Sequence, residues 1–378
     1  MAPRRPIRIL IVDDSAVMRS LLRTVVVAAP GMEVAGTAAD GESGLSALEA
    51  LRPDLVLLDV EMPVMDGLVT LKELRARRHK MPVIMCSSLT QRGAKVTIEA
   101  LASGASDYVA KPAGQSSREA AIKALSQELI PKIQALTSQT MSTPQAPALG
   151  VGRTVLFMPP VALPLKSQQI TATPTVLAIG VSTGGPAALD ILLPALPGNF
   201  PLPVLIVQHM PELFTKLFAE RLNGRCQLRA CEAAEGDPVR PGTIYIAKGN
   251  WHMEVMPAAR LGFPATLHLS QGALENHCRP AADVLFRSVA QVFGSGVLAV
   301  VLTGMGSDGM LGCRVIRDQG GSVLAQDQAT SAVWGMPGAV TNAGLVHKVL
   351  PLGAIAPEIL RIVSRTYSEA RELRESVV

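Results

Sequence analysis

Aromatic residues make up only 3% of the 378-residue chain, and no apolar run approaches the ~20 residues that a membrane-crossing helix requires. The shortage of rings argues against stacking platforms for single-stranded nucleic acid, and a net charge of +4 is too small for a polybasic nucleic-acid coat. Asp13 and Asp14 interrupt the basic and apolar start before it reaches the length of a signal peptide. We therefore expect a cytoplasmic protein that neither binds nucleic acid nor inserts into a membrane.

The five cysteines include no C-x-x-C pair. An odd number without metal-ligand spacing fits neither a disulfide framework nor a zinc site, so we expect reduced thiols with structural roles. Hydrophobic residues make up 48% of the chain and charged residues 17%, which is typical of globular domains with large cores. At ~150 residues per domain, 378 residues predict two domains with room for a linker.

Short apolar segments alternate with segments of helical periodicity in the first third of the chain. This alternation predicts a five-stranded parallel sheet covered by helices on both faces, in a domain over residues 1–130. A last helix is expected at about 117–129. The predicted strands cover residues 7–12, 32–38, 54–59, 82–87 and 107–110.

Seven prolines and no acidic residue lie between residues 131 and 174. This composition predicts a linker over 131–173 in an extended or irregular conformation. Its apolar segment 155–163 is expected to lie on a domain surface. Strand and helix patterns resume at residue 175 and predict a second, doubly wound α/β domain over 174–378.

Polar residues follow the ends of the predicted strands in the first domain. Because the carboxyl ends of parallel strands meet at one edge of a sheet, these side chains are expected to converge. Clustered carboxylates favour a hard divalent cation such as Mg²⁺, beside which one of them can attack a phosphoryl group. A single such residue is often only a helix N-cap, a role that Asp14 or Ser15 could serve, but the whole set favours a site. The set is Asp13, Asp14, Asp59, Ser87 and Lys111.

The segments VDDSAVMR, LLDVEMPVMDG and DYVAKP resemble the signatures of response-regulator receiver domains, over about residues 6–130. The resemblance implies a flavodoxin-like fold in which Asp59 accepts the phosphoryl group. It also implies that Asp13 and Asp14 hold Mg²⁺ together with Asp59. The implied switch residues beside the phosphoryl group are Ser87, Lys111 and Tyr108.

The second domain begins with a strand, a glycine-rich turn and a helix, in which GVSTGGP at 180–186 matches G-x-S-x-G. Such a turn exposes the Ser182 hydroxyl near unpaired helix N–H groups. A dinucleotide-binding loop fits less well, because Ser182 replaces the middle glycine and the next strand ends in Gln208 and His209 instead of an acidic residue. A glycine turn with a capping serine is the other alternative.

A serine nucleophile needs a base, and the base needs an orienting acid. His209 directly follows the predicted strand 203–208 and is the preferred base; His347 is the competitor, but it lies at no clear strand end. Asp308 is the preferred acid, because it lies in a glycine-rich loop directly after the buried strand predicted at 297–302; Asp327 is the second choice. We expect Thr183 and the Met305 N–H to contact the substrate or its oxyanion.

With the receiver signatures, the segments IGVSTGGP, VQHMP, LTGMGSDGMLG and WGMPGAV resemble the CheB-type chemotaxis protein-glutamate methylesterases along nearly the whole chain. The resemblance implies Ser182 as nucleophile, His209 as general base and acid, and Asp308 as orienting carboxylate, with no cofactor in the esterase domain. It further implies hydrolysis of glutamate γ-methyl esters on methyl-accepting chemoreceptors, deamidation of receptor glutamines, and a CheA-type histidine kinase as phosphodonor.

The resemblance also implies regulation, in which the unphosphorylated receiver covers the esterase cleft and phosphorylation opens it. The rival hypothesis is a response regulator whose second domain only binds a partner. A DNA-binding output would need a basic recognition helix, and none stands out after residue 175.

Overall fold

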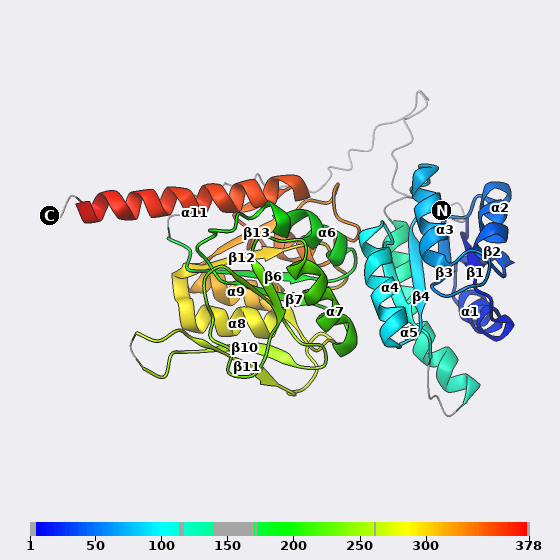
Figure 1. The fold of residues 1–378 in the computed structure, drawn as a ribbon, viewed down its shortest axis with the longest axis horizontal. Helices are drawn as coiled ribbons and strands as arrows, with labels where there is room; N and C mark the ends of the chain where they lie inside the picture. Colours follow the sequence, from blue (N-terminus) through cyan, green and yellow to red (C-terminus); the bar gives the residue numbers. More distant parts are fainter. Residues whose placement is uncertain (1–4, 113–116, 139–169, 171, 261, 376–378) are drawn as a thin grey trace, which may run out of the picture.

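The computed structural model describes residues 5–112, 117–138, 170, 172–260 and 262–375. In this part of the chain two α/β units lie side by side, each built on its own sheet (Figure 1). The first sheet has five strands in the order β2-β1-β3-β4-β5, and the second has seven in the order β14-β13-β12-β6-β7-β9-β8. All neighbouring strands within these two sheets are parallel, which confirms the predicted fold class.

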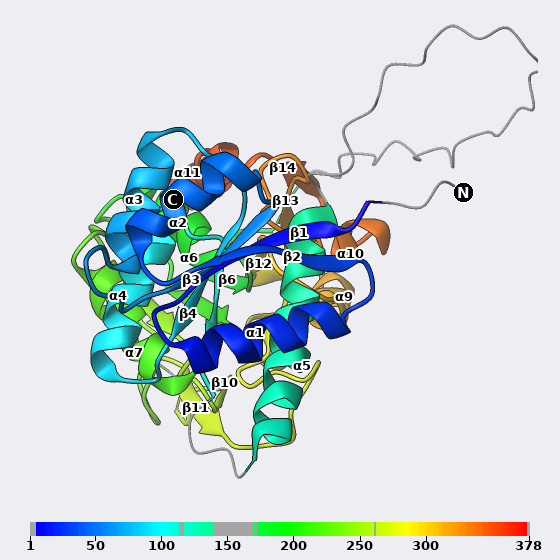
Figure 2. The same cartoon turned by 90° about the vertical axis from the view of Figure 1, so that its right-hand side faces the viewer.

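The first unit places β1, β3 and β4 in the middle of its sheet. Helices α1 and α5 cover one face, and α2, α3 and α4 cover the other (Figure 2). The elements are β1 (Ile7–Val12), α1 (Ala16–Ala28), β2 (Met32–Ala38), α2 (Gly41–Leu51), β3 (Leu55–Asp59), α3 (Gly67–Ala76), β4 (Val83–Ser87), α4 (Gln91–Ala102), β5 (Asp107–Ala110) and α5 (Arg118–Ser138).

Helix α5 runs past the end expected from the sequence and continues through Pro131 to Ser138. A proline inside a helix removes one backbone hydrogen bond and usually ends the helix. Here Leu129, Ile133 and Leu136 are buried against the sheet at helical spacing, and this packing carries the helix beyond the proline.

The fully buried strands β6 and β12 lie next to each other near the middle of the second sheet. Helices α6, α7 and α11 pack on one face of its sheet, and α8, α9 and α10 pack on the other. The elements are β6 (Val176–Val181), α6 (Gly185–Leu192), β7 (Val204–Gln208), α7 (Glu212–Asn223), β8 (Arg229–Glu232), β9 (Thr243–Ile246), the hairpin β10 (His252–Met256) and β11 (Thr266–Ser270), α8 (Ala282–Phe293), β12 (Val297–Val301), α9 (Met310–Asp318), β13 (Ser322–Gln326), α10 (Met336–Asn342), β14 (Lys348–Leu350) and α11 (Leu352–Glu375), with 3₁₀ turns at Leu193–Ala195 and Gly294–Gly296.

The two units meet where α4 of the first packs against α6 and α7 of the second (Figure 1). The rings of Tyr108 and Phe214 stack across the boundary, with centroids 4.7 Å apart and an interplanar angle of 11°. Thr183 Oγ1 donates a hydrogen bond to Asp107 Oδ2 at 2.6 Å, also between units. Both side chains of this bond are buried.

Most of the predicted linker, including its apolar segment 155–163, lies outside the described residues. The predicted domain boundaries therefore stay predictions. Of the described helices, none combines enough length with enough apolar character to cross a membrane.

Candidate functional site

The first candidate site is an acidic pocket at the carboxyl edge of the first sheet. Asp13 and Asp14 follow β1 and Asp59 ends β3, so the sheet order brings their carboxylates together, with one oxygen of each within 4.8 Å of the others. Lys111 follows β5, and its Nζ lies 3.0 Å from Asp13 Oδ2 and 2.7 Å from Asp59 Oδ1. Four of the five side chains predicted to converge, the three carboxylates and Lys111, therefore lie in one cluster.

The electrostatics of this pocket suit a cation. Burial raises the pKa of Asp59 to about 6; Lys111 opposes the rise, and the charge of Asp13 adds to it. Asp59 Oδ2 is buried and has no hydrogen-bond partner among the described residues. A set of carboxylate oxygens with one orphaned buried atom fits a hard divalent cation.

The two remaining switch candidates lie on β4 and β5. Ser87 ends β4 and is buried, and its Oγ accepts a hydrogen bond from Thr97 Oγ1 at 2.7 Å. Tyr108 lies on β5 and points away from the acidic pocket, because its ring stacks on Phe214 of the second unit. Burial raises the pKa of Tyr108 well above its ordinary value. Tyr108 thus belongs to the boundary between the units.

The second candidate site begins at the turn after β6, where local packing requires glycines. Gly184 has φ +77°, a left-handed conformation that side chains rarely adopt. A Cβ on Gly185 would lie 2.0 Å from Gln208 Oε1, and one on Gly304 would lie 2.9 Å from Ser182 Cβ. The glycines therefore allow the loop after β12 and the strand β7 to approach Ser182 closely.

His209 directly follows β7, the strand beside β6, as predicted. Its Nε2 lies 2.8 Å from Asp308 Oδ2, and both side chains are largely buried. Its Nδ1 lies 3.6 Å from the Sγ of Cys278. Ser182 Oγ makes no hydrogen bond within the part of the chain that the structure describes; the Ser182 N–H donates to Thr303 O at 3.0 Å.

Asp308 is held as an anion by the start of α8. Its two oxygens accept hydrogen bonds from the N–H groups of Ala282 at 2.6 Å, Asp283 at 3.0 Å and Gly309 at 2.9 Å, in addition to His209. Burial alone would raise the pKa of Asp308, but the His209 bond and these backbone donors lower it. Because the ionised carboxylate only accepts hydrogen bonds, Nε2 of His209 carries the proton between them.

The pKa of His209 reflects opposing influences. Burial lowers it, whereas the hydrogen bonds to Asp308 and Cys278 and their charges raise it, to about 9 in balance. A nearly buried imidazole between a carboxylate and a thiol therefore favours its protonated form in this arrangement of the two units.

The alternative base and acid lie elsewhere. His347 contacts Arg317, and its Nδ1 accepts a hydrogen bond from the Val323 N–H near the start of β13, far from the carboxyl edge that carries Ser182. Burial and the charge of Arg317 lower the pKa of His347 to about 4. Asp327 accepts two hydrogen bonds from Thr330 in a local turn. Of the described histidines, the structure brings His209 to Asp308.

Three residues of this site had no sequence prediction. Asn276, at φ +52°, donates from Nδ2 to Asp308 Oδ1 and to Asp283 Oδ2, both at 2.9 Å. Cys278 contacts His209, although the sequence suggested only structural cysteines. The loop carrying Asn276 and Cys278 has no strand or helix pattern, so its sequence holds no signal that places it beside the catalytic candidates. Asp283 lies in the first turn of α8, where acidic residues are common, so its sequence position gave no sign of a role in the site.

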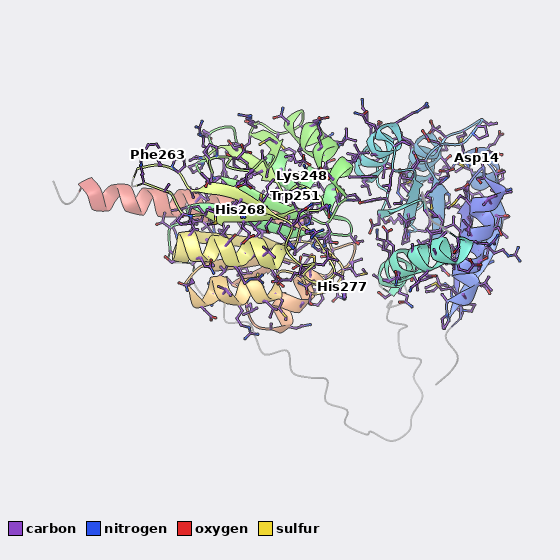
Figure 3. The ribbon with its side chains drawn as sticks, turned by 90° about the horizontal axis from the view of Figure 1, so that it is seen from below. Asp14, Lys248, Trp251, Phe263, His268 and His277 are labelled. Carbon is purple, nitrogen blue, oxygen red and sulfur yellow. The ribbon has the colours of Figure 1, made fainter. Side chains whose placement is uncertain are left out.

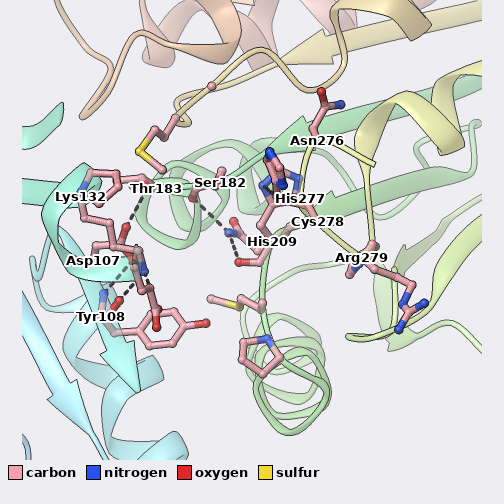
Figure 4. Close-up of a pocket in the computed structure, with 18 of the residues that line it drawn as sticks. Asp107, Tyr108, Lys132, Ser182, Thr183, His209, Asn276, His277, Cys278 and Arg279 are labelled. Carbon is pink, nitrogen blue, oxygen red and sulfur yellow. Dashed lines mark hydrogen bonds and ion pairs between the residues drawn. The ribbon is translucent and has the colours of Figure 1, made fainter. Parts of the chain in front are cut away.

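A cavity of about 970 Å³ lies at the boundary between the units (Figure 4). The second unit lines it with Ser182, His209 and Met305, and the first with Asp107 and Tyr108. Thr183 also lines it, with its hydroxyl turned to Asp107. The acidic pocket is separate: Asp14 lies at the far side of the first unit, whereas His277 lies near the boundary (Figure 3).

The fold and the two sites define a class of protein, in which a receiver-like domain with an acidic pocket precedes an α/β domain with a serine, histidine and aspartate at its strand ends. The family model described as CheB methylesterase matches residues 177–359, and the one described as response regulator receiver domain matches residues 9–123.

Two curated relatives match nearly end to end. The protein-glutamate methylesterase/protein-glutamine glutaminase of Nocardioides sp. is 48% identical over 361 residues, covering 95% of this chain and 96% of its own. The protein of the same description from Trichodesmium erythraeum is 46% identical and covers 94% of this chain and 98% of its own. A solved structure, the Thermotoga maritima CheB methylesterase catalytic domain, is 40% identical and covers 51% of this chain and 100% of its own, with a TM-score of 0.49.

The chain belongs to the protein-glutamate methylesterase/protein-glutamine glutaminase family of response regulators. The family resemblance predicted from the sequence is confirmed.

Proposed function

We propose that this protein is a phosphorylation-activated serine esterase of chemotaxis that hydrolyses glutamate γ-methyl esters on methyl-accepting chemoreceptors to glutamate and methanol. The observation that carries the proposal is the 2.8 Å bond between His209 and Asp308 at the cavity that Ser182 also lines. A chain of carboxylate, imidazole and serine at one set of strand ends is the arrangement that activates a hydroxyl nucleophile.

In the proposed reaction Ser182 Oγ attacks the γ-carbonyl carbon of the methyl ester. His209 takes the serine proton at Nδ1, because its Nε2–H is committed to Asp308. The negative oxygen of the tetrahedral intermediate is stabilised by backbone N–H groups of the loops that carry Thr183 and Met305, both of which line the cavity.

The intermediate collapses by breaking the bond to the methoxy group, which leaves as methanol with the proton from His209. Water then attacks the acyl-enzyme, giving its proton to His209; the bond to Ser182 Oγ breaks, Ser182 takes the proton from His209, and the receptor glutamate leaves as a side-chain carboxylate. A glutamine amide follows the same route with ammonia as leaving group, so we include deamidation of receptor glutamines in the proposal.

The proposed control begins in the acidic pocket of the receiver. Asp59 would accept the phosphoryl group from a CheA-type histidine kinase, with Asp13, Asp14 and Asp59 holding Mg²⁺, which neutralises the phosphoryl oxygens when bound. Ser87 and Lys111 would then contact the new phosphoryl group.

Contacts at the boundary support a closed, inactive arrangement before phosphorylation. The Asp107 to Thr183 bond engages the residue next to the proposed nucleophile, and Tyr108, whose ring stacks on Phe214, lines the same cavity. Phosphorylation would shift the population toward an open arrangement in which a receptor helix reaches Ser182. The cytoplasmic location stays a prediction.

The direct test measures methanol release from methylated receptor membranes by the full chain, in Mg²⁺ with a small phosphodonor. The Ser182→Ala variant should lose ester hydrolysis and glutamine deamidation together, because both need the same Oγ. The matched control is Ser270→Ala, whose hydroxyl bonds Glu254 on the β10-β11 hairpin. Hydrolysis by Ser182→Ala near the wild-type rate would show that the nucleophile is another group.

A further inference from the structure

The nitrogen of His209 that the proposed reaction needs is not free in this structure. Nε2 is bound by Asp308, and Nδ1 faces the thiol of Cys278 at 3.6 Å, within the range of a sulfur hydrogen bond. When the imidazole is protonated, Nδ1–H donates to the sulfur; when it is neutral, the thiol donates to Nδ1. In either state the thiol takes up the hydrogen-bonding capacity of Nδ1, so Ser182 Oγ must displace it from that nitrogen to transfer its proton.

We propose that Cys278 is a positioning residue that holds Nδ1 of His209 in the resting enzyme and must exchange places with the Ser182 hydroxyl before the ester is attacked. This inference rests on the proposed esterase function. It assigns a role to Cys278 in the loop before α8. The same loop carries Asn276, which donates a hydrogen bond to Asp308.

The backbone around Cys278 holds the thiol in place. Asn276 and His277 both have left-handed φ values, at +52° and +62°, and the Cys278 N–H donates to Glu275 O at 2.9 Å. Arg279, the next residue, bonds the carbonyl oxygens of Gln271 and Gly272. The loop is therefore anchored on both sides of the thiol, so the proposed exchange at Nδ1 needs only side-chain rotation of Cys278 or His209 and leaves this backbone in place.

The charge balance around His209 supports this role. Cys278 is one of the groups that hold the pKa of His209 at about 9, where the imidazole is protonated at neutral pH and accepts no proton from serine. Removing the sulfur leaves Asp308 as the direct partner and allows burial to lower the pKa. Other ionisable groups that line the same cavity are Asp107, Glu128, Lys132, Glu212, His277 and Arg279.

The first experiment titrates His209 by NMR in the unphosphorylated full chain with labelled histidine, its signal assigned by loss in His209→Gln. Cys278→Val, which fills the space without a thiol, should lower the pKa of His209 by about one pH unit. Ser182→Ala should leave it unchanged, because Ser182 Oγ has no hydrogen bond among the described residues. Cys231→Ala, which removes a thiol on β8, is the matched control.

The opposite pattern, with the pKa moved by Ser182→Ala and not by Cys278→Val, would overturn the proposal. If Cys278→Val fails to fold by its thermal unfolding curve, Cys278→Ala takes its place with the same expectation. This titration needs no substrate, so it decides the role of Cys278 even if the proposed ester hydrolysis proves wrong.

The second experiment records the pH dependence of kcat/KM for methanol release by the phosphodonor-activated chain. The acid limb of Cys278→Val should move to lower pH by about one unit, which is a roughly tenfold gain in rate on that limb. A structural role would instead lower the rate at every pH and leave the limb in place, and that result contradicts the proposal. Absence of methanol release by the wild type would count against the esterase function alone.

Discussion

Replacing Asp107 by Asn tests the closed arrangement with a change of a single charge. Asp107 Oδ2 accepts the Thr183 hydroxyl at 2.6 Å, and both residues are buried. A buried hydrogen bond to an ionised group contributes about 1.5–3 kcal/mol and a neutral one about 0.5–1.5 kcal/mol. The substitution therefore removes about 1 to 1.5 kcal/mol from the closed form if the bond breaks on opening. That energy shifts the ratio of open to closed molecules about 5- to 12-fold.

The receiver should keep its fold in this variant. With its amide oxygen in the place of Asp107 Oδ1, Asn still accepts the Tyr108 N–H and faces Lys132 Nζ, and its NH₂ forms the neutral bond to Thr183. Lys132 Nζ also keeps the Tyr108 carbonyl at 2.6 Å and Glu128 at 3.1 Å. The assay is methanol release by the unphosphorylated full chain, which should rise about 5- to 12-fold in Asp107→Asn. Asp54→Asn is the control, since the partners of Asp54 are Arg5 and Arg8 of the same unit. Basal rates equal to wild type in Asp107→Asn, with normal phosphodonor activation, would refute the reasoning.

Three further substitutions address the chemistry and its control. Asp308→Asn should lower kcat roughly 10⁴-fold in the methanol assay, because an amide NH₂ would face backbone N–H donors and no longer orient His209. Because the folded-state pKa of Asp308 is lowered, its contribution to stability is present above its unfolded pKa and is lost as pH falls through the folded value. Urea unfolding should therefore show a larger loss from Asp308→Asn at pH 7 than near pH 3. His347→Gln should leave kcat unchanged, since His347 lies with Arg317; a large drop would restore it as the base. Asp59→Asn should release methanol at the same rate with and without phosphodonor. A rate that rises with phosphodonor would show that another residue accepts the phosphoryl group.

Much of the architecture follows from residue patterns that the sequence displays directly. Alternating buried strands and helices predicted both parallel sheets, and strand-end positions predicted that Asp13 and Asp59 converge at one sheet edge and His209 and Asp308 at the other. This works because the carboxyl ends of parallel strands converge wherever the chain connects them through helices.

The parts that escaped prediction depend on contacts between segments without a local signature. Asn276 and Cys278 lie in an irregular loop with left-handed residues, where no periodicity shows which way a side chain points. The continuation of α5 beyond Pro131 depends on burial of Ile133 and Leu136, which outweighs the local preference of proline. The bond from Thr183 to Asp107 joins two units, and neither sequence segment specifies its partner.

The most direct test of the account compares methanol release from methylated chemoreceptor membranes by one preparation of the full chain, with Mg²⁺ alone and then with a small phosphodonor added. The account predicts slow release that rises on addition of the phosphodonor, because phosphorylation of Asp59 exposes Ser182 and His209. Equal release in both conditions would contradict the coupling of the two units, and no release in either would contradict the esterase itself.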